Sequence, residues 1–209
     1  DISEQDATRI LDLVSWSLCP AYALQTGREV KLPLDWFQTI NEFNGASAGN
    51  TGVESVLQGL CELVERHVCA RIDLQQPVLP TLDPDSMHDP VLQNLYAAFT
   101  GNNIQVWLKD FSLGFEVPTV GALAYDPATF PHSSEIVFTA GTASSPEKAA
   151  IRALTEVAQL AGDFESGSCY EPSGLYKLSS FEHCRWLQQG PLVPLSSLPD
   201  ISDQDMALE

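Results

Sequence analysis

Basic residues are scarce in this sequence of 209 residues, which holds 10 lysines and arginines against 28 aspartates and glutamates. The formal net charge of -18 means that most of the surface repels a nucleic-acid backbone or an anionic membrane surface. We therefore expect no nucleic-acid partner and no membrane partner for this protein.

Long hydrophobic runs are also missing, since no stretch of about 18 consecutive apolar residues occurs. The first residues, Asp1 to Glu4, have neither the basic nor the apolar segment of a signal peptide. The sequence starts without methionine on a helix-like stretch and stops where another helix begins. We expect it to be an excised piece of a longer chain.

Two kinds of motif are absent. The five cysteines are odd in number and form no C-x-x-C pair, which favours reduced thiols in a cytoplasmic compartment over a disulfide framework or a zinc ribbon. Neither G-x-x-x-x-G-K-[ST] nor G-x-G-x-x-G occurs. Any nucleotide site must therefore be built from groups other than a glycine-rich phosphate loop.

The apolar spacing predicts an α+β fold, a layered sandwich of mixed or antiparallel sheet with packed helices, because helices and strands alternate too irregularly for a doubly wound sheet. The strongest helix covers residues 53–72, and Ser145, Pro146 and Glu147 begin a second one. The other predicted elements are a helix over 4–27 that Pro20 ends or kinks, a strand with its turn over 30–37, a loop over 41–50, an extended linker over 77–90, a helix over 91–100, strands over 104–108, 117–125 and 135–139, and a helix near 179–188.

Three carboxylates share a narrow stripe on the helix over 53–72. At 100° per residue, Glu65 lies about 20° and Glu62 about 80° from Glu54 around the helix axis. An apolar group occupies the other side and is predicted to be the buried face: Val53, Leu57, Leu60, Leu63, Val64 and Val68.

The carboxylate stripe has two interpretations from the residues alone. Such a stripe in an acidic chain is usually a solvated surface, and Thr51 with Glu54 fits a capping box that would occupy Glu54. Alternatively, Glu54, Glu62 and Glu65, with Asn50 just ahead of the helix, form an oxygen-rich site for a hard cation such as Mg²⁺.

Arginine accompanies the acids on both strong helices. Arg66 borders the carboxylate stripe, as an ion-pair partner or as a phosphate ligand. On the helix that starts at Pro146, the spacing divides two groups. The polar stripe holds Lys148, Arg152, Glu156, Gln159 and Asp163, and the apolar side holds Ile151, Leu154, Val157 and Ala158.

The order of these segments resembles the YcaO family. The central family motif matches N-G-A-S-A-G-N-T over residues 44–51, the acid Glu54, and Q-G-L-C-E-L-V-E-R-H over residues 58–67. The K-D-F segment over 109–111 and R-A-L-T-E-x-x-Q over 152–159 are similar to the next two family blocks. The resemblance implies a partial YcaO-like domain over 1–209 that lacks the N-terminal part of the nucleotide site.

The resemblance implies an enzyme dependent on ATP and Mg²⁺ that phosphorylates the oxygen of a peptide backbone amide, so that a nucleophile can replace it. Azoline formation, thioamidation and an accessory role in ribosomal-protein methylthiolation are the family activities. The implied partners are a peptide or protein substrate and a protein that presents it, and this piece alone is expected to be inactive. The implied metal ligands are Glu54, Glu62 and Glu65, and the implied nucleotide-binding residues are Asn50, Arg66, Arg152 and Glu156.

A second reading is a YcaO-like module without catalytic activity. Such a module would bind a peptide or a partner protein, or would form a homodimer. Loss of nucleotide binding on replacing Glu62 by Gln separates the enzyme from this module.

Overall fold

The computed structural model describes residues 2–41, 44–130, 136–160 and 188–202, which belong to two units. The first unit ends at Ala46 and the second begins at Ser47. The helix predicted near 179–188 lies outside the described residues except for its last residue. Among the described helices, none is both long enough and apolar enough to cross a membrane.

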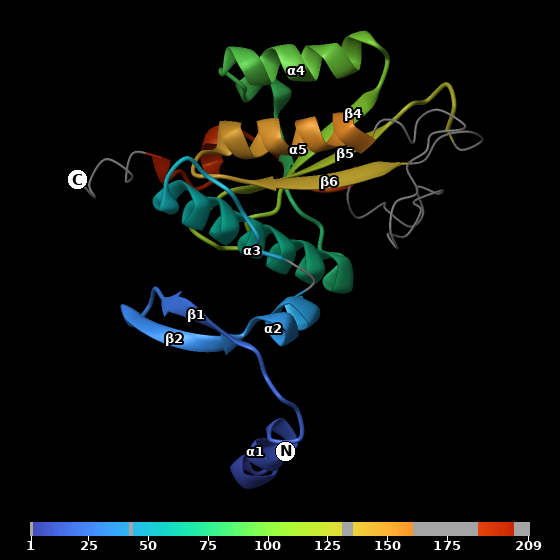
Figure 1. Cartoon of the computed structure of the whole chain (residues 1–209). Coiled ribbons are helices and arrows are strands. Elements are labelled where there is room, and N and C mark those ends of the chain that lie inside the picture. The colour runs from blue at the N-terminus through green and yellow to red at the C-terminus, as the bar shows by residue number, and fades with distance from the viewer. Residues whose placement is uncertain (1, 42–43, 131–135, 161–187, 203–209) are drawn as a thin grey trace. The chain divides into compact units, whose positions relative to one another are not determined.

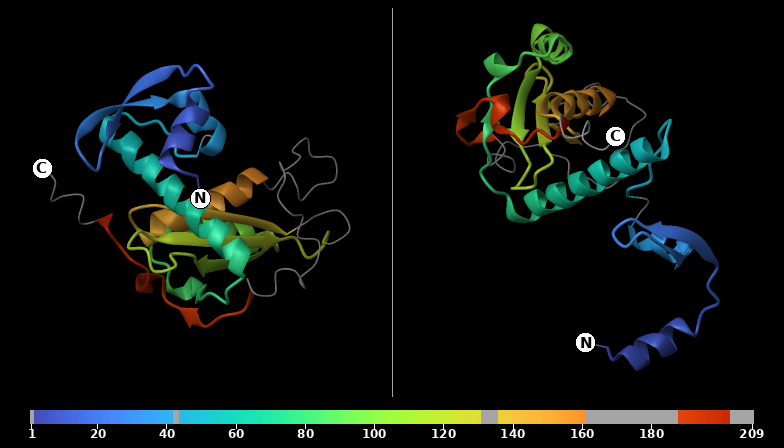
Figure 2. Two further views of the ribbon diagram at one scale, coloured as in Figure 1. Left: turned by 90° about the horizontal axis from the view of Figure 1, so that it is seen from below. Right: turned by 90° about the vertical axis from the view of Figure 1, so that its left-hand side faces the viewer.

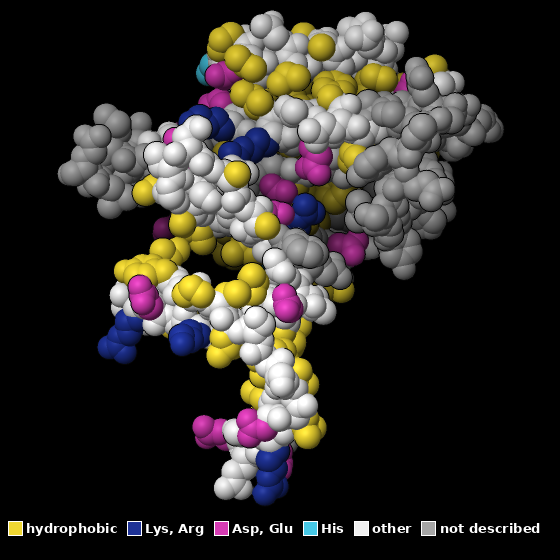
Figure 3. All heavy atoms as spheres, in the orientation of Figure 1, with side chains coloured by type: hydrophobic (Ala, Val, Ile, Leu, Met, Phe, Trp, Pro, Cys, Tyr) yellow, Lys and Arg dark blue, Asp and Glu magenta, His cyan; other side chains and the backbone are white. Residues whose placement is uncertain are grey.

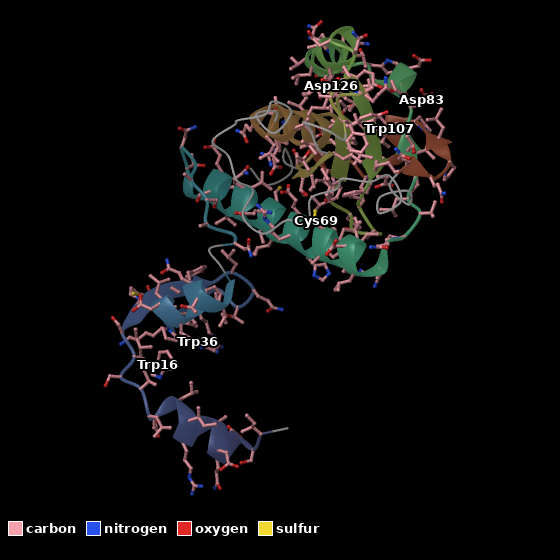
Figure 4. The ribbon with its side chains drawn as sticks, turned by 90° about the vertical axis from the view of Figure 1, so that its right-hand side faces the viewer. Trp16, Trp36, Cys69, Asp83, Trp107 and Asp126 are labelled. Carbon is pink, nitrogen blue, oxygen red and sulfur yellow. The ribbon has the colours of Figure 1, made fainter. Side chains whose placement is uncertain are left out.

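The first unit pairs a β-hairpin with two short helices. Its elements are α1 (Glu4–Leu11), β1 (Leu18–Ala23), β2 (Arg28–Pro33) and α2 (Leu34–Asn41). The helix predicted over 4–27 is therefore wrong beyond Leu11, where β1 and β2 pair in antiparallel fashion. Pro20 is tolerated in β1 because both strands of a two-stranded sheet are edge strands. Trp16 and Trp36 meet edge to face in this unit (Figure 4).

The second unit is built on a five-stranded sheet with strand order β6-β5-β4-β3-β7. The pairs β6–β5, β5–β4 and β4–β3 are antiparallel, and β7 pairs with β3 in parallel. The prediction of an extended linker over 77–90 is wrong in part, because β3 lies within this range and pairs with both β4 and β7. The strands are β3 (Thr81–Leu82), β4 (Gln105–Asp110), β5 (Thr119–Tyr125), β6 (Val137–Thr142) and β7 (Leu192–Val193).

Three long helices lie on the two sides of this sheet. In Figure 1, α4 (Pro90–Gly101) and α5 (Pro146–Leu160) lie on one side and α3 (Gly52–Gln75) on the other, and Figure 2 shows the same layers from two further directions. Short 3-10 turns occur at Pro84–Ser86 and Leu195–Ser197. These layers of helix and sheet agree with the α+β sandwich that the sequence predicts.

Alternation along β5 explains why the sheet has two apolar faces. Val120, Ala122 and Ala124 belong to the cluster that α4 and α5 cover, and Leu123 belongs to the cluster on the α3 side, with Ile72 of α3. The position of Gly121 also matters, because a Cβ atom there would lie 2.4 Å from the ring of Phe111. The small residue Gly121 in β5 thus leaves room for the ring of Phe111, which directly follows β4.

The helix α3 packs through a face other than the predicted one. Its buried residues are Gly59, Cys61, Val68 and Ile72. Of the predicted buried face, Val68 is buried and Val64 is partly exposed, whereas Val53, Leu57, Leu60 and Leu63 are exposed. Small residues at the contact let the helix approach the sheet closely, and this approach turns the carboxylate side toward β6 and α5. The periodicity locates an apolar stripe but does not reveal which face meets the sheet.

A buried lysine anchors β7 and the segment before it. Lys109 of β4 is 1% exposed, and its Nζ donates to Thr81 Oγ1 at 2.8 Å and to the carbonyl of Gln189 at 2.5 Å. Burial lowers the pKa of Lys109 to about 8. Both acceptors are neutral oxygens, and they bind two of the three N–H groups of the ammonium.

Lys109 is expected to make the free energy of unfolding depend on pH in the alkaline range. Between about pH 8 and 10.5 the unfolded chain still binds a proton that the folded chain has released, so the stability of the wild type rises with pH. Relative to Lys109→Met, the free energy of unfolding should rise by about 3 kcal/mol across this range. Denaturant titrations at several pH values measure it. The same change at exposed Lys148 is the control, and a pH-independent difference for Lys109→Met would contradict the account.

Candidate functional site

A capping box fixes the start of α3 and holds Glu54. The backbone N–H of Glu54 donates to Thr51 Oγ1 at 3.2 Å, and Glu54 Oε2 accepts from the N–H groups of Asn50 and Thr51 at 2.7 and 3.2 Å. The structure thus confirms the capping box that the sequence predicts. One oxygen of Glu54 is engaged in this box, and Asn50 is fixed at the N-terminus of the helix.

The loop ahead of α3 is tied to the first turn of the helix. Ser47 Oγ donates to the carbonyl of Ser55 at 2.6 Å, and Ser55 Oγ donates to the carbonyl of Ser47 at 3.1 Å. A Cβ atom on Gly49 would lie 2.5 Å from the Ser55 nitrogen, so only glycine fits this close approach. The loop therefore has one defined path to Asn50.

Glu65 is the half-buried acid at the centre of the site. Its Oε2 accepts the backbone N–H of Thr142, the last residue of β6, at 2.9 Å. Burial first, and then the charge of Glu156, raise the pKa of Glu65 to about 7, against the opposing effects of Arg66, the Thr142 hydrogen bond and Arg152. Folding therefore brings a carboxylate into surroundings that favour its neutral form unless a cation joins it.

Glu156 is the second partly buried acid, and it comes from α5. Burial raises its pKa, and the charge of Arg66 opposes this effect. Glu65, Glu156, Arg66 and Arg152 form what we call the acid–arginine cluster. Figure 3 shows acidic and basic side chains gathered between α3 and α5. Two helices that are about 90 residues apart in the sequence thus contribute one acid and one arginine each.

Hydrogen bonds hold Arg152 between α3 and β6. Its Nη1 donates to the carbonyl of Thr142 at 2.5 Å, and its Nη2 donates to Gln58 Oε1 at 2.7 Å. Arg66 Nε lies 3.9 Å from Glu62 Oε1, at the edge of ion-pair distance. The backbone of Thr142 therefore contacts Glu65 through its N–H group and Arg152 through its carbonyl group.

The structure brings some predicted site residues together and leaves others apart. Glu65, Glu156, Arg66 and Arg152 interact, Glu62 pairs with Arg66, and Glu54 belongs to the capping box. Over the described parts of the chain, no group of three or more His, Cys, Asp or Glu is arranged to hold a metal ion. The carboxylates nevertheless suit Mg²⁺, which commonly takes one or two carboxylates and completes its shell with phosphate oxygens and water.

Sequence reasoning gave no role to two members of the site. Gln58 lies on the carboxylate stripe, and its spacing of seven residues from Glu65 places both on one side of α3. This spacing was the available signal. Thr142 contributes through its backbone, which carries no sequence signal at all.

Cys69 lies beside the cluster without the properties of a nucleophile. Burial, followed by the charge of Glu65, raises the pKa of its thiol to about 12. The side chain belongs to α3 (Figure 4) and packs against the apolar cluster on that face of the sheet. A thiol that stays protonated packs as an apolar group.

Comparison with known proteins gives the class of this fold and site. The family model described as "YcaO cyclodehydratase, ATP- and Mg²⁺-binding" matches residues 4–203. The chain belongs to the YcaO family.

Similar proteins include two solved structures and one relative from Escherichia coli. The heterocyclase TruD shares 25% identity at a TM-score of 0.68, over 88% of this chain and 28% of that chain. YcaO from Methanopyrus kandleri, bound with AMPPCP and Mg²⁺, shares the fold at 24% identity and a TM-score of 0.63, over 87% of this chain and 50% of that one. The Escherichia coli ribosomal protein S12 methylthiotransferase accessory factor YcaO is 30% identical over 100 residues, 47% of this chain and 17% of the factor. The chain matches half or less of each protein.

Proposed function

We propose that this chain supplies one side of the nucleotide site of an enzyme that uses ATP and Mg²⁺ to activate a backbone amide of a peptide. The acid–arginine cluster between α3 and α5 is the observation that carries the proposal. Partly buried acids with raised pKa values, beside two arginines, are a typical arrangement at functional sites. The similarity to the heterocyclase TruD supports a cyclodehydratase type of reaction.

The residues of the cluster fit the two components of magnesium nucleotide. Glu65 and Glu156, whose charges interact, would hold the metal through carboxylate oxygens. Glu62 lies three residues before Glu65 on α3, and Glu54 and Asn50 lie at the start of the same helix. A Mg²⁺ ion held by these residues would supply positive charge against the phosphates during phosphoryl transfer. Arg66 and Arg152 would contact phosphate oxygens, to which a guanidinium donates geometrically matched hydrogen bonds.

Substrate activation places one further demand on the site. The amide oxygen must attack the terminal phosphate in line with the leaving group. The residues of α3 and α5 would therefore have to hold the phosphates in one fixed orientation. Arg152 is held by bonds to two other elements, β6 and α3, before any ligand arrives. A pre-positioned charge of this kind stabilises a transition state more effectively than a mobile one.

Glu62→Gln tests the proposal in the full natural protein. Calorimetric titration with Mg²⁺ and AMPPCP should give an affinity at least about tenfold weaker for the variant, because one carboxylate near the phosphates loses its charge. Circular dichroism should report an unchanged fold.

Exposed Glu116 supplies the matched control, since Glu116→Gln makes the same chemical change at a side chain that is not a member of the cluster. It should bind as the wild type does. Absence of binding by a well-folded wild type would overturn the proposal and favour the module without catalytic activity.

A further inference from the structure

The side chain of Gln58 accepts a hydrogen bond from Arg152 and thereby restricts the motion of the arginine side chain. Arg152 is exposed on α5, and a long exposed side chain otherwise samples many rotamers. The bond from Nη1 to the Thr142 carbonyl holds one nitrogen, around which the guanidinium can still rotate. The bond from Nη2 to Gln58 Oε1 holds a second nitrogen and thereby fixes the plane of the group.

We propose that Gln58 is a positioning residue, which sets the orientation of the Arg152 guanidinium beside Glu65 and Glu156 so that it meets a phosphate without rearrangement. The inference rests on the proposed nucleotide-binding function. Gln58 and Glu65 are seven residues apart, so α3 presents the acid and the holder of the arginine on the same side. Relative placement of the two groups is then a property of one rigid helix.

A neutral acceptor suits this role better than a carboxylate does. An amide oxygen orients a guanidinium and leaves its full positive charge, whereas a carboxylate would neutralise it and compete with phosphate. The guanidinium has five N–H donors. Within the part of the chain that the structure describes, the bonds to Thr142 and Gln58 leave three of them for a further acceptor.

Gln58→Leu removes the acceptor and keeps a side chain of similar size. In the ligand-free protein, ¹⁵N relaxation of the Arg152 Nε–H group should report a clear fall in order for this variant. The affinity for Mg²⁺ and AMPPCP should weaken about tenfold, as expected for the loss of one hydrogen bond to a charged group. Gln75→Leu, at the last and exposed position of α3, is the control and should change neither quantity.

A double-mutant cycle with Arg152→Ala separates positioning from a general structural role. Because Gln58 acts through Arg152, Gln58→Leu should weaken binding no further once Arg152 is alanine. An equal additional loss in both backgrounds would overturn the inference, as would unchanged order of Arg152 in Gln58→Leu.

The two readouts distinguish this inference from the proposed function. A wild type that binds no nucleotide, together with an Arg152 that loses order in Gln58→Leu, would support the positioning role and overturn the nucleotide function. If Gln58→Leu binds the nucleotide as strongly as the wild type does, the nucleotide function would be supported and the positioning role overturned.

Discussion

Glu65→Gln is expected to stabilise the ligand-free protein by about 2 kcal/mol at pH 8. A pKa of about 7 against an ordinary 4.5 means that ionising Glu65 in the folded state is disfavoured by about 3 kcal/mol. We lower this figure because part of the carboxylate is exposed. Glutamine is neutral and can still accept the Thr142 N–H, so it avoids the penalty.

The pH dependence of this effect has a definite sign. The folded-state pKa is raised, so between about pH 4.5 and 7 the folded chain binds more protons than the unfolded chain. The free energy of unfolding of the wild type therefore falls as pH rises through this window. Glu65→Gln has no titrating group at this position, so its free energy of unfolding does not show this fall. Denaturant titrations from pH 4.5 to 8 should show the gap between the two proteins opening and then levelling off.

The same variant should lose the response to ligand. Mg²⁺ with AMPPCP at about 100 times its Kd should stabilise the wild type by about 2.7 kcal/mol and Glu65→Gln far less. Glu116→Gln is the control and should follow the wild type at every pH. A constant difference between wild type and Glu65→Gln from pH 4.5 to 8 would contradict the account of a buried, repelled carboxylate.

Gly141→Ala should destabilise the second unit by about 3 kcal/mol. A Cβ atom at this position of β6 would lie 2.4 Å from the Ala149 carbonyl oxygen and 2.6 Å from the Ala153 nitrogen. Both are backbone atoms of α5, so the helix would have to move away from the sheet. Since α5 carries Arg152 and Glu156, nucleotide affinity should fall together with stability.

Gly101→Ala is the matched control for this substitution. Gly101 is the last residue of α4, and a Cβ atom there meets nothing within 4 Å. Alanine should be neutral or stabilise by a few tenths of a kcal/mol, because it restricts the unfolded chain. Urea unfolding curves of the two variants measure the contrast. Equal midpoints would show that α5 does not pack on Gly141 as closely as described.

Local signals in the sequence predicted α3, α4 and α5 well, whereas α2 begins inside the segment predicted as a strand with its turn over 30–37. Thr51 and Glu54 predict the start of α3 because they form a capping box. Ser145 before Pro146 predicts the start of α5, where Ser145 Oγ accepts the N–H of Lys148. The strands β4, β5 and β6 also follow from their β-branched and aromatic residues, with shifts of a few residues at their ends. These signals are carried by neighbours along the chain.

Contacts between distant segments could not be predicted in this way. The strand β3 forms because Thr81 pairs with Lys109 and Leu192, which are far away in sequence. Spacing on α3 put Glu62 and Glu65 on one side but left open whether that side met solvent or protein. The pKa of Glu65 is raised by burial and by the charge of Glu156 on α5, which the spacing on α3 does not reveal. The bond between Gln58 and Arg152 likewise joins residues that no local pattern connects.

A crystal structure of the full natural protein with Mg²⁺ and AMPPCP tests the central claim most directly. The account predicts phosphate oxygens within hydrogen-bond distance of the Arg152 guanidinium. It also predicts a Mg²⁺ ion about 2.1 Å from a carboxylate oxygen of Glu65 or Glu156. A nucleotide bound away from α3 and α5, with neither acid near a metal ion, would contradict it.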